Sequence, residues 1–239
     1  MKKFLWQFNF STLEQLRAIV QASKGKKIIL GTSESESKFF GLEEAVYLTR
    51  KSNLLLNLDH GKDIKYIKQA IKIGYDMIHF DGSDLKFKDN IKITKELVKL
   101  AHKKGVFLEA EFDPISDKLT DPKKALFFLK QTKADSLAIA VGNRHGKEKV
   151  NINFERIREI KRLTGSSLVL HGGSGVSLTE LKKAIQSGIN KININTELRI
   201  IWKQALKQSL KQKDLKPYNL LKPVQEKIKE KVEKYLLIF

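Results

Sequence analysis

The sequence contains no cysteine among its 239 residues, which excludes disulfide bonds and thiolate metal sites. Any metal ion must therefore be held by histidine, aspartate or glutamate. No apolar run approaches the roughly 20 residues that a membrane-spanning helix needs. The N-terminal stretch MKKFLWQFNFSTLEQL has only a short apolar patch before polar residues follow. We therefore expect neither a membrane partner nor a signal peptide. We expect a cytoplasmic location.

Negative charge is also scarce, because 27 acidic residues face 46 lysines and arginines, giving a net charge of +19. Such a charge raises the question of nucleic-acid binding. The lysines are, however, spread along every helical stretch, as in KITKELVKLAHKKG, and no arginine-rich patch alternates with aromatic residues. We interpret the charge as a solvated surface with a general attraction for anionic substrates, and we expect no nucleic-acid partner.

Short β-rich runs alternate with amphipathic stretches along the whole chain. Helical spacing separates the runs, for example in STLEQLRAIVQAS, where Ser11 is the expected N-cap. This alternation predicts parallel strands joined by helices, and a count of eight favours a single (β/α)8 barrel domain over residues 1–239. A doubly wound open sheet is the alternative, and an extra C-terminal helix is expected over about 222–239. The eight runs are 5–10, 27–33, 54–60, 77–83, 106–112, 136–142, 167–173 and 191–196.

Polar residues gather at the C-terminal ends of these runs. In a parallel barrel those ends share one rim, where barrel enzymes carry their active sites. The acid and the histidine in NLDHG thus gain partners that are distant in sequence. The rim residues are Asn9, Ser33, Asp59, His60, Asp81, Ser83, Glu109, Glu111, His145, His171, Asn193, Asn195 and Thr196.

Three of the five histidines, His60, His145 and His171, fall at strand ends. In a chain without cysteine, they are typical of a three-histidine zinc site with an open fourth position. His79 lies inside the fourth run, where a supporting role is possible, and His102 lies near a helix end. Neither is expected to be a ligand.

Glu109 and Glu111 are two residues apart on a strand, so their side chains point to the same side. Facing inward, they are buried carboxylates that need a cation. One interpretation places Glu111 beside the metal. The other is a polar layer of the barrel that is satisfied by lysine or water.

The segment HGGSG, residues 171–175, offers unobstructed backbone N–H groups just before a helix, which is typical of phosphate binding. Its position after the seventh strand, followed by NINT after the eighth, is where barrels commonly bind phosphate. Thr196 is alternatively the N-cap of the following helix.

The blocks NLDHG, HFDGSDL, DSLAIAVGNRHG, LVLHGGSGV and KININTEL stand in the order found in the class II fructose-bisphosphate/tagatose-bisphosphate aldolase family. The chain resembles this metal-dependent family from FNFSTLEQLRAIV onward. The resemblance implies reversible cleavage of a ketose bisphosphate to dihydroxyacetone phosphate and glyceraldehyde 3-phosphate. It also implies a homodimer or homotetramer.

By this resemblance, Asp59 is the catalytic acid/base and His60, His145 and His171 bind Zn²⁺. A second divalent or a monovalent cation near the phosphate is a further possibility. The residues implied to bind substrate are Asn9, Ser33, Gly146, Gly172, Gly173, Ser174, Asn193, Ile194, Asn195 and Thr196.

Two departures from the family bear on the site. The loop FDPISDKLTDP after the fifth strand is short where the family has a longer one, sometimes with a further acid. Either Asp113 or Asp117 replaces that acid, or no residue does. Arg144 stands directly before His145, and we hypothesise that it binds the distal phosphate. The alternative is that it faces the outer helices.

Two other functions remain open from the sequence. The short loop is compatible with a relative that binds metal and sugar phosphate but has lost catalysis. A Schiff-base aldolase would need a buried lysine, for which Lys191 is the only candidate.

Overall fold

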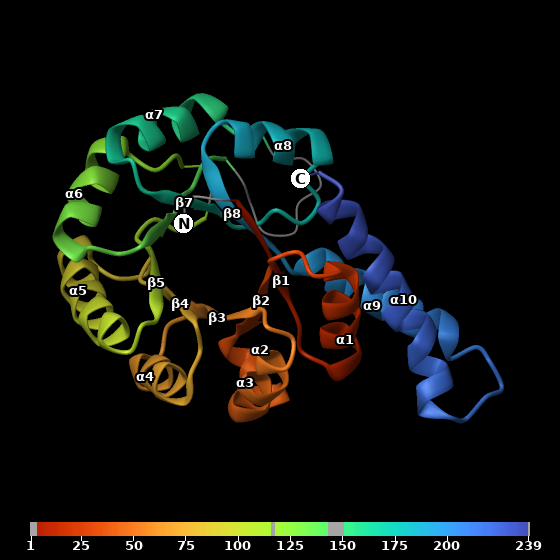
Figure 1. The fold of residues 1–239 in the computed structure, drawn as a ribbon. Helices are drawn as coiled ribbons and strands as arrows, with labels where there is room; N and C mark the ends of the chain where they lie inside the picture. The colour runs from red at the N-terminus through yellow and green to blue at the C-terminus, as the bar shows by residue number, and fades with distance from the viewer. Residues whose placement is uncertain (1–3, 116–117, 143–150, 239) are drawn as a thin grey trace.

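The computed structural model describes residues 4–115, 118–142 and 151–238. Its strands are all parallel and close into a barrel in sequence order, which confirms the expected (β/α)8 architecture over an open sheet (Figure 1). Every run expected to be a strand contributes one. The strands are β1 (Leu5–Asn9), β2 (Ile29–Ser33), β3 (Leu55–Gly61), β4 (Met77–Asp81), β5 (Phe107–Glu111), β6 (Ser136–Ala138), β7 (Ser167–Leu170) and β8 (Ile189–Ile194).

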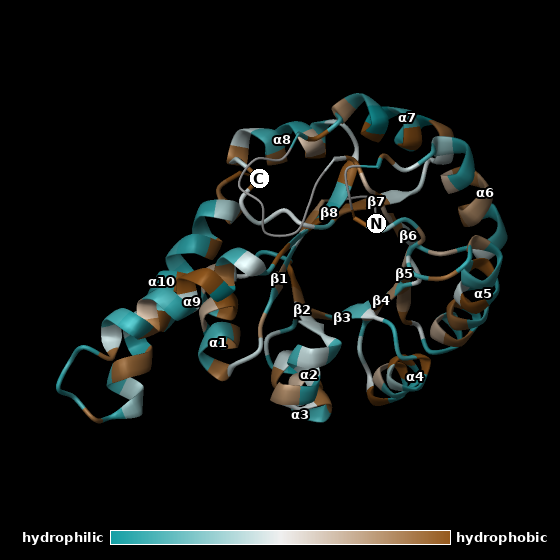
Figure 2. Cartoon of the chain, turned by 180° about the vertical axis from the view of Figure 1, so that it is seen from behind, coloured by the Kyte–Doolittle hydropathy of each residue, from teal (hydrophilic) through white to brown (hydrophobic). Residues whose placement is uncertain are grey.

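The helices form a ring around the barrel, so the strands are covered on their outer face (Figure 1). Strand side chains such as Phe8, Leu30 and Leu56 are consequently buried in the layer between strands and helices. Hydrophilic residues are prominent on the outer helices in Figure 2. The helices are α1 (Leu13–Ser23), α2 (Glu34–Phe40), α3 (Leu42–Arg50), α4 (Ile64–Ile73), α5 (Phe87–Lys103), α6 (Pro122–Thr132), α7 (Phe154–Thr164), α8 (Leu178–Gln186), α9 (Thr196–Ser209) and α10 (Pro217–Leu236).

Two helix starts differ from the sequence-based expectation. The N-cap of α1 is Thr12 rather than Ser11, because the Gln15 side chain reaches back to the Thr12 backbone N–H at 3.2 Å. Helix α10 begins at Pro217, before the expected start near 222, and Pro223 lies inside it. Proline is well tolerated in a first helical turn, so Pro217 starts this helix.

Helices α9 and α10 pack against each other and extend away from the barrel (Figure 1). From Val224 onward α10 returns to the barrel, where Val224, Ile228 and Val232 are buried and α10 packs against α1. Within the described ranges, no helix is both long and apolar enough to span a bilayer.

Candidate active site

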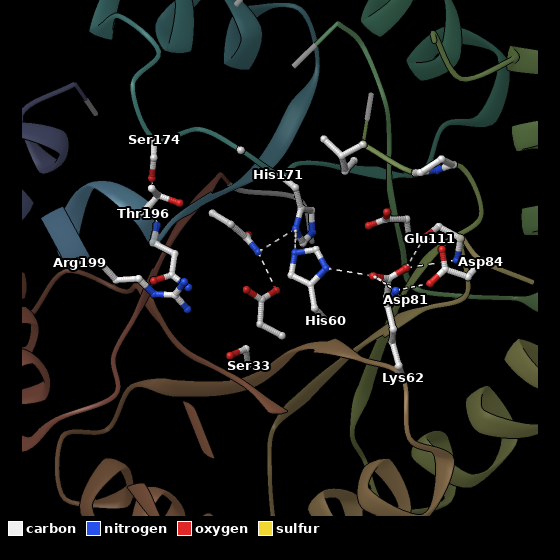
Figure 3. A pocket seen from close by; sticks show the side chains of 17 residues that line it. Ser33, His60, Lys62, Asp81, Asp84, Glu111, His171, Ser174, Thr196 and Arg199 are labelled. Carbon is white, nitrogen blue, oxygen red and sulfur yellow. Dashed lines mark hydrogen bonds and ion pairs between the residues drawn. The ribbon is translucent and has the colours of Figure 1, made fainter. Parts of the chain in front are cut away.

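A cavity of about 540 Å³ opens at the C-terminal rim of the barrel (Figure 3). It collects residues from strand ends and loops that lie far apart in sequence, as the barrel topology predicts. Twelve of the residues that the sequence placed at this rim or in the site line it: Ser33, Asp59, His60, Asp81, Ser83, Glu111, His171, Gly172, Ser174, Asn193, Asn195 and Thr196.

Asp59 and His60 both face this cavity although they are neighbours on β3. Consecutive strand residues normally point to opposite faces. Here the pairing of β3 with β4 shifts register between Leu58 and Gly61, and His60 has a φ of +50°, a conformation that side chains other than glycine rarely adopt. Because of this backbone irregularity, the side chains of Asp59 and His60 point into the same cavity.

His60 and His171 point their imidazole rings at each other. Nε2 of His60 lies 3.0 Å from Nδ1 of His171. The opposite nitrogen of each ring faces a carboxylate: Nδ1 of His60 lies 3.3 Å from Asp81, and Nε2 of His171 lies 2.8 Å from Glu109. A carboxylate accepts a hydrogen bond from a nitrogen that bears a proton, so in the neutral rings the two converging nitrogens are those that carry lone pairs.

Two nitrogens at this distance share either a proton, as a hydrogen bond, or a metal cation, and the surrounding carboxylates favour positive charge between them. Burial lowers the pKa of His60, but Asp59 and Asp81 outweigh burial and raise it. Burial and the neighbouring His79 lower the pKa of His171 to about 3, so this ring is neutral. Neutral imidazole with a carboxylate on its far nitrogen is the usual form of a metal ligand. These residues fit a divalent metal ion.

Further metal-binding atoms surround this pair. One ligand atom each from Asp59, His60, His79 and His171 lies within 4.8 Å of the others, and His60, Asp81 and Glu111 form a second such group. Oε2 of Glu111 is buried, with Nε2 of His79 at 3.3 Å. A buried carboxylate favours a nearby cation, so Glu111 adds to the attraction for one.

Asp59 is held by two amide groups. Nδ2 of Asn9 donates to its Oδ2 and Nδ2 of Asn193 donates to its Oδ1, both at 2.9 Å. Burial raises the pKa of Asp59, but His60, together with His79 and His171, outweighs burial and holds the pKa well below its usual range. Asp59 is therefore an ionised carboxylate with a fixed orientation, as a base requires.

His79 lies closer to the site than the sequence suggested. It is fully buried, with Nδ1 at 3.5 Å from Asp59 and Nε2 at 3.3 Å from Glu111. The His60 backbone N–H donates to Nδ1 at 3.1 Å, which requires an unprotonated Nδ1. Burial lowers the pKa of this ring, whereas Glu109 and the other carboxylates raise it. Because Nδ1 accepts from the backbone, the ring proton lies on Nε2 and faces Glu111, which gives His79 a supporting position.

The segments proposed to bind phosphate meet at one side of the cavity. Thr196 is the first residue of α9 and Asn195 its N-cap, so Thr196 is not the N-cap itself. The Ser174 hydroxyl accepts from the backbone N–H groups of Asn195 and Glu197 at 3.2 and 3.3 Å. The positive end of α9 thus faces the cavity beside Ser174, as an anion site requires (Figure 3).

Three residues proposed to bind substrate do not line this cavity. Asn9 lies below it and contacts Asp59. The Gly173 N–H donates to the Asn193 carbonyl at 3.3 Å, and a side chain at Gly173 would collide with Ile192, so this glycine permits close packing of β7 on β8. The Ile194 side chain is fully buried in the core.

Glu36 was not singled out from the sequence, yet it joins several site residues. It is 5% exposed, and it accepts from the side chains of Asn9 at 3.2 Å and Asn195 at 3.1 Å. Arg199 pairs with it at 2.6 Å and lines the cavity. The signal was the capping box SESE, in which Glu36 caps the Ser33 backbone N–H, but that motif predicts only a helix start.

A second cationic side chain, in addition to Arg199, lies on the other side of the histidine pair. Lys62 lines the cavity opposite Arg199, paired with Asp84 and 3.7 Å from Asp81 (Figure 3). No sequence pattern points to this position, because lysine is abundant along the whole chain. The cavity therefore has one cation on each side of His60.

Comparison with known proteins identifies the relationship that this geometry suggests. Residues 3–239 match the family model described as fructose-bisphosphate aldolase class-II. The chain belongs to the class II fructose-bisphosphate aldolase family. It is 34% identical to the probable fructose-bisphosphate aldolase of Bacillus subtilis (strain 168), covering 95% of this chain and 88% of that protein. It is also 34% identical to the fructose-bisphosphate aldolase of Geobacillus stearothermophilus, covering 85% and 79%.

Solved structures agree with this class II aldolase assignment. The YdjI aldolase from Escherichia coli K12 superposes with a TM-score of 0.90 at 30% identity, covering 99% of this chain and 91% of that one. The fructose-bisphosphate aldolase of Campylobacter jejuni shares the fold, with a TM-score of 0.82 at 18% identity, covering 99% and 90%. The chain is therefore a class II aldolase, a lyase.

Some proposed residues of this aldolase cannot be placed. Arg144, His145, Gly146 and Asp117 lie outside the described residues, so their roles stay predictions. In the described part of the loop after β5, Pro114 and Ile115 line the cavity, whereas Asp113 does not. His102 pairs with Asp135 at 3.0 Å on the surface, in keeping with its exclusion as a ligand.

Proposed function

We propose that this aldolase reversibly cleaves a ketose bisphosphate, fructose or tagatose 1,6-bisphosphate, to dihydroxyacetone phosphate and glyceraldehyde 3-phosphate. The observation that carries the proposal is the position of the ionised Asp59 beside the converging nitrogens of His60 and His171. The names of the aldolases similar to this chain support the substrate class.

A zinc ion held by His60, His171 and, as the sequence predicts, His145 would supply Lewis-acid stabilisation of negative charge on the ketose oxygens. Asp59 removes the proton from the hydroxyl of the carbon that becomes the aldehyde. As that carbonyl forms, the bond to the neighbouring ketose carbon breaks, and this carbon takes up a proton from water to give dihydroxyacetone phosphate. Its two oxygens already accept from Asn9 and Asn193, and each keeps a further lone pair for the proton. In the reverse direction Asp59 returns the proton. Glu111 remains a candidate for a metal-adjacent carboxylate or for contact with a second cation.

The anion site at Ser174, Asn195 and Thr196 fixes one phosphate of the substrate, which orients the ketose toward Asp59. A bisphosphate that spans the histidines needs a second cation. Lys62 lies on the side opposite this anion site (Figure 3) and is one candidate, and Arg144 is the other. Ser33 lines the wall between the two ends and is proposed as a substrate contact.

The Schiff-base mechanism has little support. Lys191 is fully buried, does not line the cavity and is paired with Glu109 at 2.6 Å. A lysine that attacks a carbonyl must reach the substrate and lose its proton. The impaired relative remains the second candidate, because the described loop after β5 brings no acid into the cavity.

The α9–α10 extension suggests how copies of the chain would associate. Leu210, Leu215 and Tyr218 on this extension are 59%, 90% and 67% exposed. Apolar side chains exposed together mark interaction surfaces. We propose self-association into a homodimer or homotetramer through them, in a cytoplasmic single-domain enzyme with no nucleic-acid or membrane partner. Light scattering after chromatography tests the assembly.

One assay tests the proposed reaction. The protein is incubated separately with fructose 1,6-bisphosphate and tagatose 1,6-bisphosphate, and release of dihydroxyacetone phosphate is measured. Release from either sugar supports the proposal, and the faster one identifies the preferred stereochemistry. Binding of zinc and of both sugars without release would instead support the impaired relative.

A further inference from the structure

Lys191 is a buried cation at the base of the site. Its side chain is fully buried on β8, and Nζ lies 2.6 Å from Oε2 of Glu109. Nζ also donates to Oε1 of Gln7 at 3.0 Å. A charge removed from water is costly even when paired, and replacing a buried ion pair by apolar residues is often neutral or stabilising. Stability alone therefore gives no reason for an ion pair here.

The first contact leads to the metal ligand. Glu109 uses its two oxygens separately: Oε2 faces Lys191, and Oε1 lies 2.8 Å from Nε2 of His171. All three side chains are fully shielded from solvent. Because Lys191 holds Oε2 of Glu109 in place, Oε1 can fix the ring orientation of His171, leaving Nδ1 for the metal.

The second contact leads to the proposed base. Oε1 of Gln7 accepts from Lys191, and Nε2 of Gln7 donates to Oδ1 of Asn9 at 2.9 Å. Nδ2 of Asn9 then donates to Oδ2 of Asp59 at 2.9 Å. Lysine can only donate, so it fixes which end of the Gln7 amide faces it. With the Gln7 amide fixed, its N–H group sets the orientation of the Asn9 amide. The Asn9 N–H group then faces Asp59 as a donor.

We propose that Lys191 is a positioning residue that orients His171 through Glu109 and Asp59 through Gln7 and Asn9. The inference rests on the proposed function, in which His171 binds the metal and Asp59 moves the proton. It explains why a lysine sits inside this barrel without reaching the cavity. The two branches are separate, so they can be broken one at a time.

Three variants test the inference. Lys191→Met keeps the length of the side chain and removes its charge, and it should weaken zinc binding and lower kcat. Glu109→Gln removes the negative charge from the His171 branch while Gln7 and Asn9 stay in place, and it should weaken zinc binding. Gln7→Leu breaks only the Asp59 branch and should lower kcat with zinc affinity unchanged. Losses of about 10–100-fold are expected, as for other residues that orient metal ligands.

Zinc affinity is measured on the apoprotein by competition with a chromogenic chelator, which needs no catalytic activity. Lys161→Met is the matched control, because Lys161 binds Ser166 and Asn190 outside the barrel interior. It should leave zinc affinity unchanged. Circular dichroism confirms that each variant is folded.

The inference is overturned if folded Lys191→Met binds zinc and turns over like wild type. If Lys191→Met does not fold, Glu109→Gln and Gln7→Leu decide the question. The inference is rejected if both variants change zinc affinity and kcat in the same way, or if neither variant changes either property. Failure of the proposed function gives another pattern. Wild-type protein would then bind zinc, and Glu109→Gln would weaken that binding, while no ketose was cleaved.

Discussion

Nε2 of His60 and Nδ1 of His171 lie 3.0 Å apart although 111 positions separate the two residues in sequence. The barrel brings them together from β3 and from the loop after β7. Asp81 and Glu109 engage the far nitrogens and so direct the near ones at a common point. This relationship is the basis of the predictions that follow.

Replacement of either histidine should abolish stoichiometric zinc binding. His60→Ala and His171→Ala each remove one nitrogen from the converging pair, and a site with a missing ligand binds zinc poorly. We expect about one zinc per chain in wild-type protein and none in either variant after dialysis, measured by atomic emission. His102→Ala is the matched control, since its ring pairs with Asp135 on the surface. Zinc retained by both site variants would disprove the assignment.

Asp59→Ala should keep zinc and phosphate binding while losing cleavage. A positioned acid or base typically contributes on the order of 10²–10⁴ in rate. We therefore expect kcat to fall by that factor, measured by coupled assay on protein of known zinc content. A variant that turns over near the wild-type rate would show that Asp59 merely orients a neighbouring group.

Much of this site could be predicted from sequence because barrel topology converts strand order into proximity. The alternation of runs placed Asp59, His60 and His171 at one rim without knowledge of contacts. The register shift that lets Asp59 and His60 face the same cavity has no sequence pattern of its own, since it depends on pairing with β4. His79 was discounted for a related reason: a histidine inside a strand gives no sign of the three carboxylates that surround it.

Glu36→Ala should destabilise the fold and perturb the site. The substitution removes the acceptor shared by Asn195 and Arg199, and one of the two acceptors of Asn9. A buried donor left unsatisfied costs about 1–3 kcal/mol, so the free energy of unfolding in urea should fall by about that amount. Glu43→Ala, on the exposed side of α3, is the control and should change stability little. Equal stability of the two variants would show that the hydrogen bonds to Glu36 do not stabilise the fold.

The contributions of two cationic side chains to binding of the distal phosphate can be distinguished by comparing substrates with one and with two phosphates. If Arg144 binds that phosphate, Arg144→Ala should raise KM for the bisphosphate and leave a singly phosphorylated ketose largely unaffected. The same comparison with Lys62→Met tests the cation that lines the cavity opposite Arg199. Arginine binds phosphate through two parallel hydrogen bonds, so its loss should have the larger effect. Equal effects on both substrates would identify a structural residue.

The central claim is that cleavage depends on a divalent metal ion at the paired histidines. The most direct measurement is the rate of ketose bisphosphate cleavage by one protein sample before chelation, after removal of metal, and after return of one equivalent of zinc. The account predicts cleavage in the first state, loss in the second and recovery in the third. Undiminished cleavage by metal-free protein would contradict it.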